Sequence, residues 1–241
     1  MLSKNEIKYI QSLCQKKQRQ EAQVFVAEGS KIVSEMLAEG YPVKNIYAVR
    51  DWADHYRGNL PITVVTPEEL SRMSCLTNPH EVIAVAEQRN PVMDPDTVDA
   101  FTLVLDGIQD PGNFGTIIRI ADWFGIRQVV ASPDTVELFN PKVIQASMGS
   151  FMRVHCWYMA LDAFLAAVKV PVYGAVFGGP SLYTYQETDK ACLLIGNEGR
   201  GIRPDLLPFI DRAVTIPRLG GAESLNAGVA AGIIVSYLKR K

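Results

Sequence analysis

The stretch Leu193-Leu194-Ile195-Gly196-Asn197-Glu198-Gly199-Arg200-Gly201-Ile202 begins as an apolar run and stops abruptly at a loop with three glycines among six residues. A continuous apolar run is typical of a buried strand in a parallel sheet. Glycines let the loop backbone take positive φ and approach a ligand closely. In open α/β sheets, ligands bind at the edge where the carboxyl ends of the strands meet. An ordinary strand-to-helix turn has the same pattern, so this loop alone leaves both interpretations open.

Residues 101–241 around this loop alternate between apolar strands and amphipathic helices. We expect strands at 101–105, 128–131, 154–158, 172–177, 191–195 and 213–217. We expect helices at 115–124, 142–150, 161–168 and 204–210, and a last helix from about 225 to 240. Repeated strand–helix units with short connections predict an α/β fold, with a mainly parallel sheet covered by helices on both faces.

Residues 1–90 predict a second, small α/β domain. The expected elements are helices at 4–18, after Ser30 and after the capping pattern Thr66-Pro67-Glu68-Glu69, and strands at 24–26, 45–49, 62–66 and 81–87. The polar segment 88–96 carries two prolines, as linkers do. We therefore divide the chain into a small domain at 1–90, a linker at 91–99 and a larger domain at 100–241.

The composition is that of a globular protein, with 48% hydrophobic and 21% charged residues in a chain of 241. The net charge of −2 excludes a polycation, but residues 1–20 hold four lysines and Arg19 against one acidic residue. This cluster fits a phosphate-binding face and a solvated helix surface about equally well. The chain has neither an apolar run of about eighteen residues nor an apolar secretion signal, so we expect no membrane association and a cytoplasmic location.

Metal and disulfide chemistry have no clear signature. The four cysteines include no Cys-x-x-Cys pair, so we expect free thiols. His80-Glu81 starts like a zinc-protease helix, but Ala84 stands where the second histidine is needed, and we expect no metal site. The glycine-rich phosphate loops of dinucleotide-binding and P-loop proteins are absent too, which weakens an ordinary nucleotide-binding function.

A second loop of interest runs from Leu105 to Arg119 with the sequence LDGIQDPGNFGTIIR. It follows an expected strand, and a helix is expected to begin near Gly115. Asn113 occupies a position where it can cap that helix or contact a ligand, and we weigh the two roles nearly equally. Arg119 lies about one turn into the helix, on a largely apolar turn, which makes a simple surface ion pair the weaker interpretation.

A third loop, residues 215–230, has the sequence TIPRLGGAESLNAGVA. It again joins a strand to a helix through glycines. Ser224 is expected to cap the helix. Asn226 is unusual in the first turn of a helix made of small apolar residues, because asparagine is a poor helix former.

These three segments together resemble the SpoU (TrmH) family of RNA ribose 2′-O-methyltransferases, within the SPOUT superfamily. The resemblance covers residues 101–241 in order: Asn113-x-Gly115-x-x-x-Arg119, Gly196-Asn197-Glu198-Gly199, and Ile216-Pro217 through Ser224-Leu225-Asn226. The segments Asn140-Pro141-Lys142 and Ala146-Ser147-x-Gly149 are also similar to the family. Phe25 to Gly29, preceded by Lys16-Lys17-x-Arg19, resembles the ribosomal-protein-like RNA-binding domain often attached.

The resemblance implies S-adenosylmethionine as the methyl donor, a carboxyl-terminal trefoil knot, and a homodimer with sites at the subunit interface. It assigns catalysis to one group of residues: Arg119, Asn113, Glu198, Ser224 and Asn226. It assigns cofactor binding to a second group: Leu194, Gly196, Asn197, Gly199, Ile216, Arg218 and Leu225. We expect RNA contacts from the basic residues Lys16, Lys17, Arg19 and Lys142.

The implied reaction places Arg119 at its centre, and the family sometimes treats this arginine as a general base. A free guanidinium has too high a pKa for that role. We therefore expect Arg119 to gather the target phosphate and to stabilise developing alkoxide, while a phosphate oxygen or water takes the proton.

Two positions depart from the family pattern: Arg218 stands where methionine is common, and Ala227-Gly228 replaces a frequent Val-Ser pair. The departures leave open which RNA is selected. Ribosomal RNA is the first expectation, because an added amino-terminal domain suits a structured target. The alternatives are transfer RNA and a non-catalytic RNA-binding protein of the same fold.

Overall fold

The computed structural model describes residues 2–89, 93 and 100–240. Its chain divides into two compact units, the first formed by Met1–Arg89 with Glu137–Met152 and the second by Asn90–Val136 with Arg153–Lys241. The expected linker at 91–99 lies, except for Met93, outside the described residues. We describe each unit separately.

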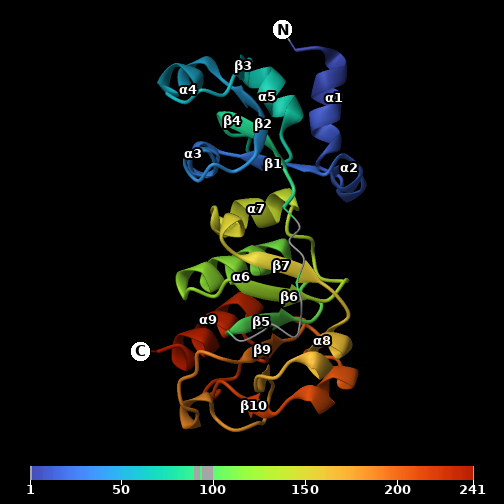
Figure 1. Ribbon diagram of the computed structural model, residues 1–241, viewed down its shortest axis with the longest axis vertical. Coiled ribbons are helices and arrows are strands. Elements are labelled where there is room, and N and C mark those ends of the chain that lie inside the picture. The colour runs from blue at the N-terminus through green and yellow to red at the C-terminus, as the bar shows by residue number, and fades with distance from the viewer. Residues whose placement is uncertain (1, 90–92, 94–99, 241) are drawn as a thin grey trace. The chain divides into compact units, whose positions relative to one another are not determined.

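The second unit is built on six parallel strands in the order β10-β8-β9-β5-β6-β7 (Figure 1). The strands are β5 (Thr102–Leu105), β6 (Gln128–Ala131), β7 (His155–Tyr158), β8 (Val172–Ala175), β9 (Cys192–Ile195) and β10 (Arg212–Val214). The central strands β5 and β9 are buried throughout, as their continuous apolar sequences predict. The expected parallel α/β sheet is confirmed.

Helices cover this sheet on both sides (Figure 1). On one side α6 (Pro111–Trp123) lies alongside α9 (Ala227–Leu238). On the other side α8 (Leu161–Ala167) and the 3₁₀ helix η4 (Pro204–Phe209) pack over a core that includes Val104, Leu194 and Phe164. Two further 3₁₀ turns are η2 (Ser150–Met152) and η3 (Leu182–Thr184).

The first unit is a four-stranded sheet in the order β1-β4-β2-β3. Its strands are β1 (Val24–Glu28), β2 (Val43–Ala48), β3 (Ile62–Val64) and β4 (Val82–Glu87). β4 pairs antiparallel with both β1 and β2, and β2 pairs parallel with β3. The helices are α1 (Lys4–Ser12), α2 (Lys16–Ala22), α3 (Ser30–Ala38), α4 (Arg50–His55) and α5 (Pro67–Met73), and α7 (Pro141–Ser147) packs against β1.

Several element boundaries differ from the sequence-based expectation. The single helix expected at 4–18 is two helices, because α1 ends at Ser12 and α2 begins only at Lys16. The helix expected at 204–210 is a 3₁₀ helix with Pro208 inside it, where a proline cannot donate to a continuing α-helical ladder. The last helix begins at Ala227 rather than near Leu225.

The expectation of four free thiols was wrong for two of them. Cys14, in the turn between α1 and α2, and Cys75, after α5, form a disulfide across a sequence separation of 61 residues. The pairing is not visible in the sequence, because only the fold brings these positions together. Cys156 and Cys192 are free, and burial raises the pKa of the Cys192 thiol to about 12.

Within the described part of the chain, no helix is both long and apolar enough to span a bilayer. No cluster of three or more potential metal-ligating side chains occurs among those residues either.

Candidate active site

The carboxyl ends of β5 and β9 meet where the strand order of the second unit changes direction. From β5 the chain proceeds outward to β6 and β7, and it later returns to place β9 and β8 on the other side of β5. Such a switch point leaves a crevice outside the carboxyl ends of the strands, which is where open α/β sheets bind ligands. The loops after β5, β9 and β10 are the three loops that the sequence singles out.

Three predicted catalytic side chains from these loops form one hydrogen-bonded chain. Asn113 Nδ2 donates to Glu198 Oε1 at 2.7 Å, and Asn226 Nδ2 donates to Asn113 Oδ1 at 2.6 Å. Asn226 Oδ1 accepts in turn from the Val229 N–H at 3.2 Å. Asn113 is only 8% exposed, so each polar atom of its amide is directed by a partner. The network joins three segments that are 85 and 113 residues apart in sequence.

Helix capping explains why these asparagines occupy the network. Asp110, rather than Asn113, caps α6, since Asp110 Oδ1 accepts from the Asn113 N–H at 2.7 Å and Pro111 opens the helix. Asn226, rather than Ser224, caps α9. The expectation that Ser224 caps the helix was therefore wrong, and the capping alternative for Asn113 is excluded, which leaves its side chain to bind Glu198.

The loop after β9 is held in shape by Asn197. Its Nδ2 donates to the Gly107 carbonyl at 2.7 Å, and its Oδ1 accepts from the Gly199 N–H at 3.0 Å. Gly196 lies against the backbone of Gly201 so closely that a Cβ there would overlap it. The glycine at 196 is thus required by the turn itself. Asn197 acts here as a support between two loops, a role compatible with backbone contacts to a ligand.

An ion pair between the buried Asp106 and the partly exposed Arg203, which the sequence did not reveal, supports the same loop. Asp106, 1% exposed at the end of β5, accepts from the Arg203 N–H at 2.8 Å, and its Oδ1 lies 2.6 Å from Arg203 Nε. The Ser132 hydroxyl, and then Arg203 and Arg200, hold the pKa of the nearby Asp134 below its usual range. The signal that could have indicated Asp106 is an acidic residue placed directly after a buried strand.

The loop after β10 presents unused backbone donors. Within the described residues, none of the backbone N–H groups from Ile216 to Asn226 has a hydrogen-bond partner. Most of this segment is exposed, including Leu225 at 47%. These free backbone N–H groups, in a segment that carries no buried charged side chain, suit a neutral ligand that accepts hydrogen bonds.

Arg119 does not join the network within one chain. It is exposed on α6 and makes no hydrogen bond or ion pair with the residues described. Six residues separate it from Asn113, which turns its side chain roughly 120° around the helix. Arg119 shares an exposed face with Trp123, which is 84% exposed and four residues further on. Its guanidinium is therefore free for a partner outside this chain.

The four predicted RNA-contacting residues separate into two groups. Lys16, Lys17 and Lys142 are exposed in the first unit. Arg19 is 1% exposed, donates from Nε to Glu137 at 2.7 Å and from Nη1 to the Leu13 carbonyl at 2.7 Å. The RNA-binding expectation for Arg19 was wrong, because its guanidinium is buried and already binds Glu137 and the Leu13 carbonyl.

The predicted cofactor residues also differ in their surroundings. Leu194 lies inside β9 with its side chain in the core, so it does not reach the loop surface. Ile216 is partly exposed, and Arg218 is exposed, with Nη1 donating to the Ala222 carbonyl at 3.3 Å. Ser224 is exposed and makes no hydrogen bond to the residues described.

Residues 100–236, which carry all three loops, match the SpoU rRNA Methylase family, and residues 4–84 match the MRM3-like substrate binding domain. The chain belongs to the SpoU rRNA methylase family. The family identification made from the loop motifs is confirmed.

Relatives of this SpoU protein align along nearly its whole length. The 23S rRNA (guanosine(2553)-2'-O)-methyltransferase RlmP of Bacillus subtilis is 31% identical over 245 residues, covering 98% of this chain and 97% of the relative. A TrmH-family structure from Porphyromonas gingivalis is 39% identical with a TM-score of 0.86 and covers 100% of this chain and 99% of that one. An AdoMet-bound rRNA methyltransferase of Sinorhizobium meliloti is 30% identical with a TM-score of 0.86, covering 100% and 96%.

Proposed function

We propose that this SpoU protein transfers a methyl group from S-adenosylmethionine to a ribose 2′-hydroxyl of ribosomal RNA. The observation that carries the proposal is the Asn113–Glu198–Asn226 network at the switch point of the parallel sheet. Full-length similarity to a 23S rRNA 2′-O-methyltransferase supports ribosomal RNA over transfer RNA as substrate. A ribosomal substrate also implies a cytoplasmic location.

The loops fit the cofactor in their chemistry. The free backbone amides of Ile216 to Asn226 can hydrogen-bond an adenine and a ribose, and the tight turn at Gly196 brings a second backbone segment to the same edge. We assign cofactor binding to Gly196, Asn197, Gly199, Ile216, Arg218 and Leu225. When bound, S-adenosylmethionine supplies an already activated methyl group. The trefoil knot expected for the carboxyl-terminal part of the chain stays a prediction.

The protein's own residues align and activate the acceptor. Arg119 binds the phosphate next to the target ribose and stabilises negative charge that develops on the 2′-oxygen. The network of Asn113, Glu198 and Asn226, with Ser224 beside it, orients the ribose. The proton leaves to a phosphate oxygen or to water, since the guanidinium cannot accept it.

A homodimer completes this arrangement. The outward face of α6 carries Thr116, Arg119 and Trp123, and the neighbouring α9 exposes Val229 at 50%. A Cβ at Gly228 would lie only 2.9 Å from the Thr116 side chain, so the two helices pack closely and form one continuous surface. An exposed tryptophan beside an unpaired arginine suits an interface in which Arg119 approaches the site of the partner subunit.

The test is methyl transfer to ribosomal RNA from cells that lack this protein, with transfer RNA as a second substrate. Arg119→Ala should lower turnover by about 10²- to 10³-fold while cofactor binding measured by calorimetry is unchanged. Arg127→Ala, an exposed arginine just before β6 at the opposite edge of the sheet, is the matched control and should keep full activity. Wild-type turnover in Arg119→Ala, or methylation of transfer RNA only, contradicts the assignment.

A further inference from the structure

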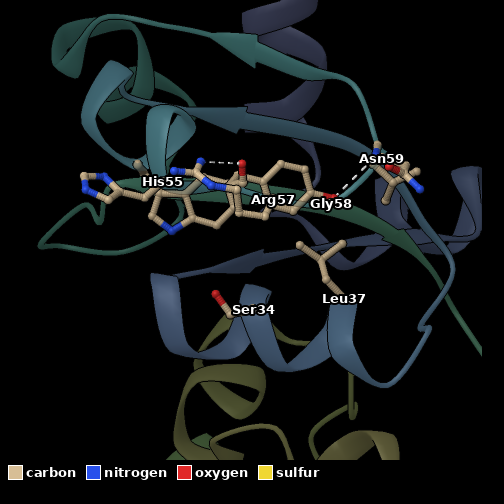
Figure 2. A pocket seen from close by; sticks show the side chains of 9 residues that line it. Ser34, Leu37, His55, Arg57, Gly58 and Asn59 are labelled. Carbon is tan, nitrogen blue, oxygen red and sulfur yellow. Dashed lines mark hydrogen bonds between the residues drawn. The ribbon is translucent and has the colours of Figure 1, made fainter.

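A cavity of about 580 Å³ opens in the first unit between α3 and the segment that follows α4 (Figure 2). Figure 2 shows Ser34 and Leu37 of α3 on one side and His55, Arg57 and Asn59 on the other. Its volume is within the range of small-ligand sites. Neither the sequence motifs nor the proposed transfer reaction uses this cavity.

An aromatic stack forms one wall of the cavity. The Trp52 and Tyr56 rings lie 5.6 Å apart between centroids, at an interplanar angle of 16°. Both side chains are half-buried and pack against a core that includes Val33 and Ile46. The core thus fixes the stack from behind, while its other surface faces the cavity. A rigid aromatic surface of this kind is what an unpaired base stacks on.

The loop after α4 is shaped around the same rings. Gly58 lies against the Tyr56 ring so closely that a Cβ would overlap the phenol. The Tyr56 hydroxyl accepts from the Leu60 N–H at 3.4 Å. Arg57 Nη1 donates to the Asp54 carbonyl at 2.6 Å, which orients the guanidinium and leaves most of its five donors unused. The polar groups of Ser34 and Asn59 complete the lining with donors and acceptors suited to a base edge.

Charge distinguishes this cavity from a second one in the same unit. The nine side chains that line the first include Arg57 and His55 and no carboxylate. The second cavity, about 1130 Å³, is lined by three carboxylates, Asp51, Glu69 and Glu81, against Arg50 and His80. The first lining therefore suits a polyanion better than the second, in which carboxylates outnumber the basic groups.

We propose that the Trp52–Tyr56 cavity binds one unpaired nucleotide of the RNA substrate, with its base stacked on the aromatic pair and its phosphate held by Arg57. This inference rests on the proposed function only in taking RNA as the substrate. The cavity thus contributes to substrate selection. It lies in the first unit, whereas the loops after β5, β9 and β10 that we propose for the reaction belong to the second.

The binding test uses the full chain and hexa-adenylate RNA as the probe. The sequence holds three tryptophans, so Trp123→Phe with Trp157→Phe leaves Trp52 as the only tryptophan reporter. A stacked base should quench its fluorescence, and a blunt RNA duplex should not. If free adenosine monophosphate quenches Trp52 at the same concentrations as hexa-adenylate, the proposal is overturned in favour of a mononucleotide site.

Substitutions separate stacking from packing. Trp52→Leu keeps an apolar side chain on the core and should weaken hexa-adenylate binding about 5- to 100-fold, while Trp52→Phe should retain most of it. Arg57→Ala should weaken hexa-adenylate binding. It should also reduce the slope of the logarithm of the binding constant against the logarithm of the salt concentration by about the value of one phosphate contact. Tyr9→Ala, which removes an exposed aromatic ring from α1, is the matched control and should bind normally. Equal binding by Trp52→Leu and Trp52→Phe, with both variants folded, overturns the proposal.

Methyl transfer separates the two proposals. Trp52→Leu should raise KM for ribosomal RNA and leave turnover at saturating RNA unchanged. Fluorescence quenching without any methyl transfer contradicts the proposed function and supports the cavity. Full methyl transfer without quenching overturns the cavity alone.

Discussion

Replacing Asn113 with aspartate tests the central network most directly. The variant puts a carboxylate where Asn113 Nδ2 now donates to Glu198 at 2.7 Å. It removes a hydrogen bond to a charged acceptor, which contributes about 1.5–3 kcal/mol. It also adds repulsion of about 4 kcal/mol for charges about 4 Å apart at an effective dielectric constant of about 20. Solvent around the partly exposed Glu198 screens most of this repulsion, so the lost hydrogen bond dominates and we expect a net loss of stability of about 2 kcal/mol at neutral pH.

The effect of Asn113→Asp should depend on pH with a defined sign. Two facing carboxylates raise the pKa of the pair in the folded variant above the unfolded value of about 4. The destabilisation should therefore be small below that value, where one carboxyl is protonated and can donate a hydrogen bond. It should grow as the pH rises through the raised folded pKa. Asn113→Ala has no such charge and should lose stability to the same extent across this range.

A second substitution should reverse the loss. In Asn113→Asp with Glu198→Gln, the new amide donates to the new carboxylate, and Asn226 still donates to the other oxygen of the carboxylate. Thermal unfolding near neutral pH should return toward that of the wild type, and cofactor affinity measured by calorimetry should recover with it. An Asn113→Asp protein as stable as the wild type, or a double variant no better than the single one, refutes the proposed role of the network.

The remaining predictions concern a glycine in a tight turn, an ion pair and a disulfide. Gly196→Ala should abolish cofactor binding, because the added Cβ overlaps the backbone that closes the loop after β9. Arg19→Ala should destabilise the first unit by about 3 kcal/mol, measured by urea unfolding, because Glu137, whose side chain is only 15% exposed, loses its partner. Cys75→Ser should lower the thermal unfolding temperature by the equivalent of about 2–4 kcal/mol, and dithiothreitol should bring the wild type to the same value, since both remove the link to Cys14.

Each of these predictions has a control in the chain. Gly220→Ala adds a Cβ that meets nothing within 4 Å and should leave cofactor binding intact. Lys17→Ala removes an exposed cation and should leave stability unchanged, in contrast to Arg19→Ala. Cys156→Ser removes a thiol outside the disulfide, so it should unfold like the wild type and should still lose stability in dithiothreitol, whereas Cys75→Ser should not respond to the reductant. Loss of cofactor binding in Gly220→Ala, or a stable Arg19→Ala protein, contradicts the corresponding structural explanation.

The sequence predicted the elements whose signal is local. The apolar runs of β5 and β9 are buried strands where expected, because central parallel strands are covered on both faces. The capping box at Thr66 and Glu69 opens α5 as predicted. The expected start of α6 near Gly115 was wrong, because Asp110 rather than Asn113 caps the helix and Pro111 opens it.

Features that depend on long-range contacts were missed or misjudged. Arg19 looked like part of a basic surface, because nothing nearby in sequence shows that Glu137 neutralises it from 118 residues away. Cys14 and Cys75 looked unpaired for the same reason. The sequence does not identify Trp52 and Tyr56 as a stacked pair, since a spacing of four residues is equally typical of a helix packed on a core.

Under the proposed mechanism, the network and the exposed arginine leave a single chain with an incomplete site. Asn113 must lie on the inner side of α6 to reach Glu198 and Asn226. Six residues later the helix has turned about 120°, so Arg119 must point away from that network. In the proposed dimer, a second copy supplies Arg119 to the reaction centre whose network belongs to the first. The helical geometry of α6 thus supports the proposed homodimer, in which Arg119 of one subunit approaches the network of the other.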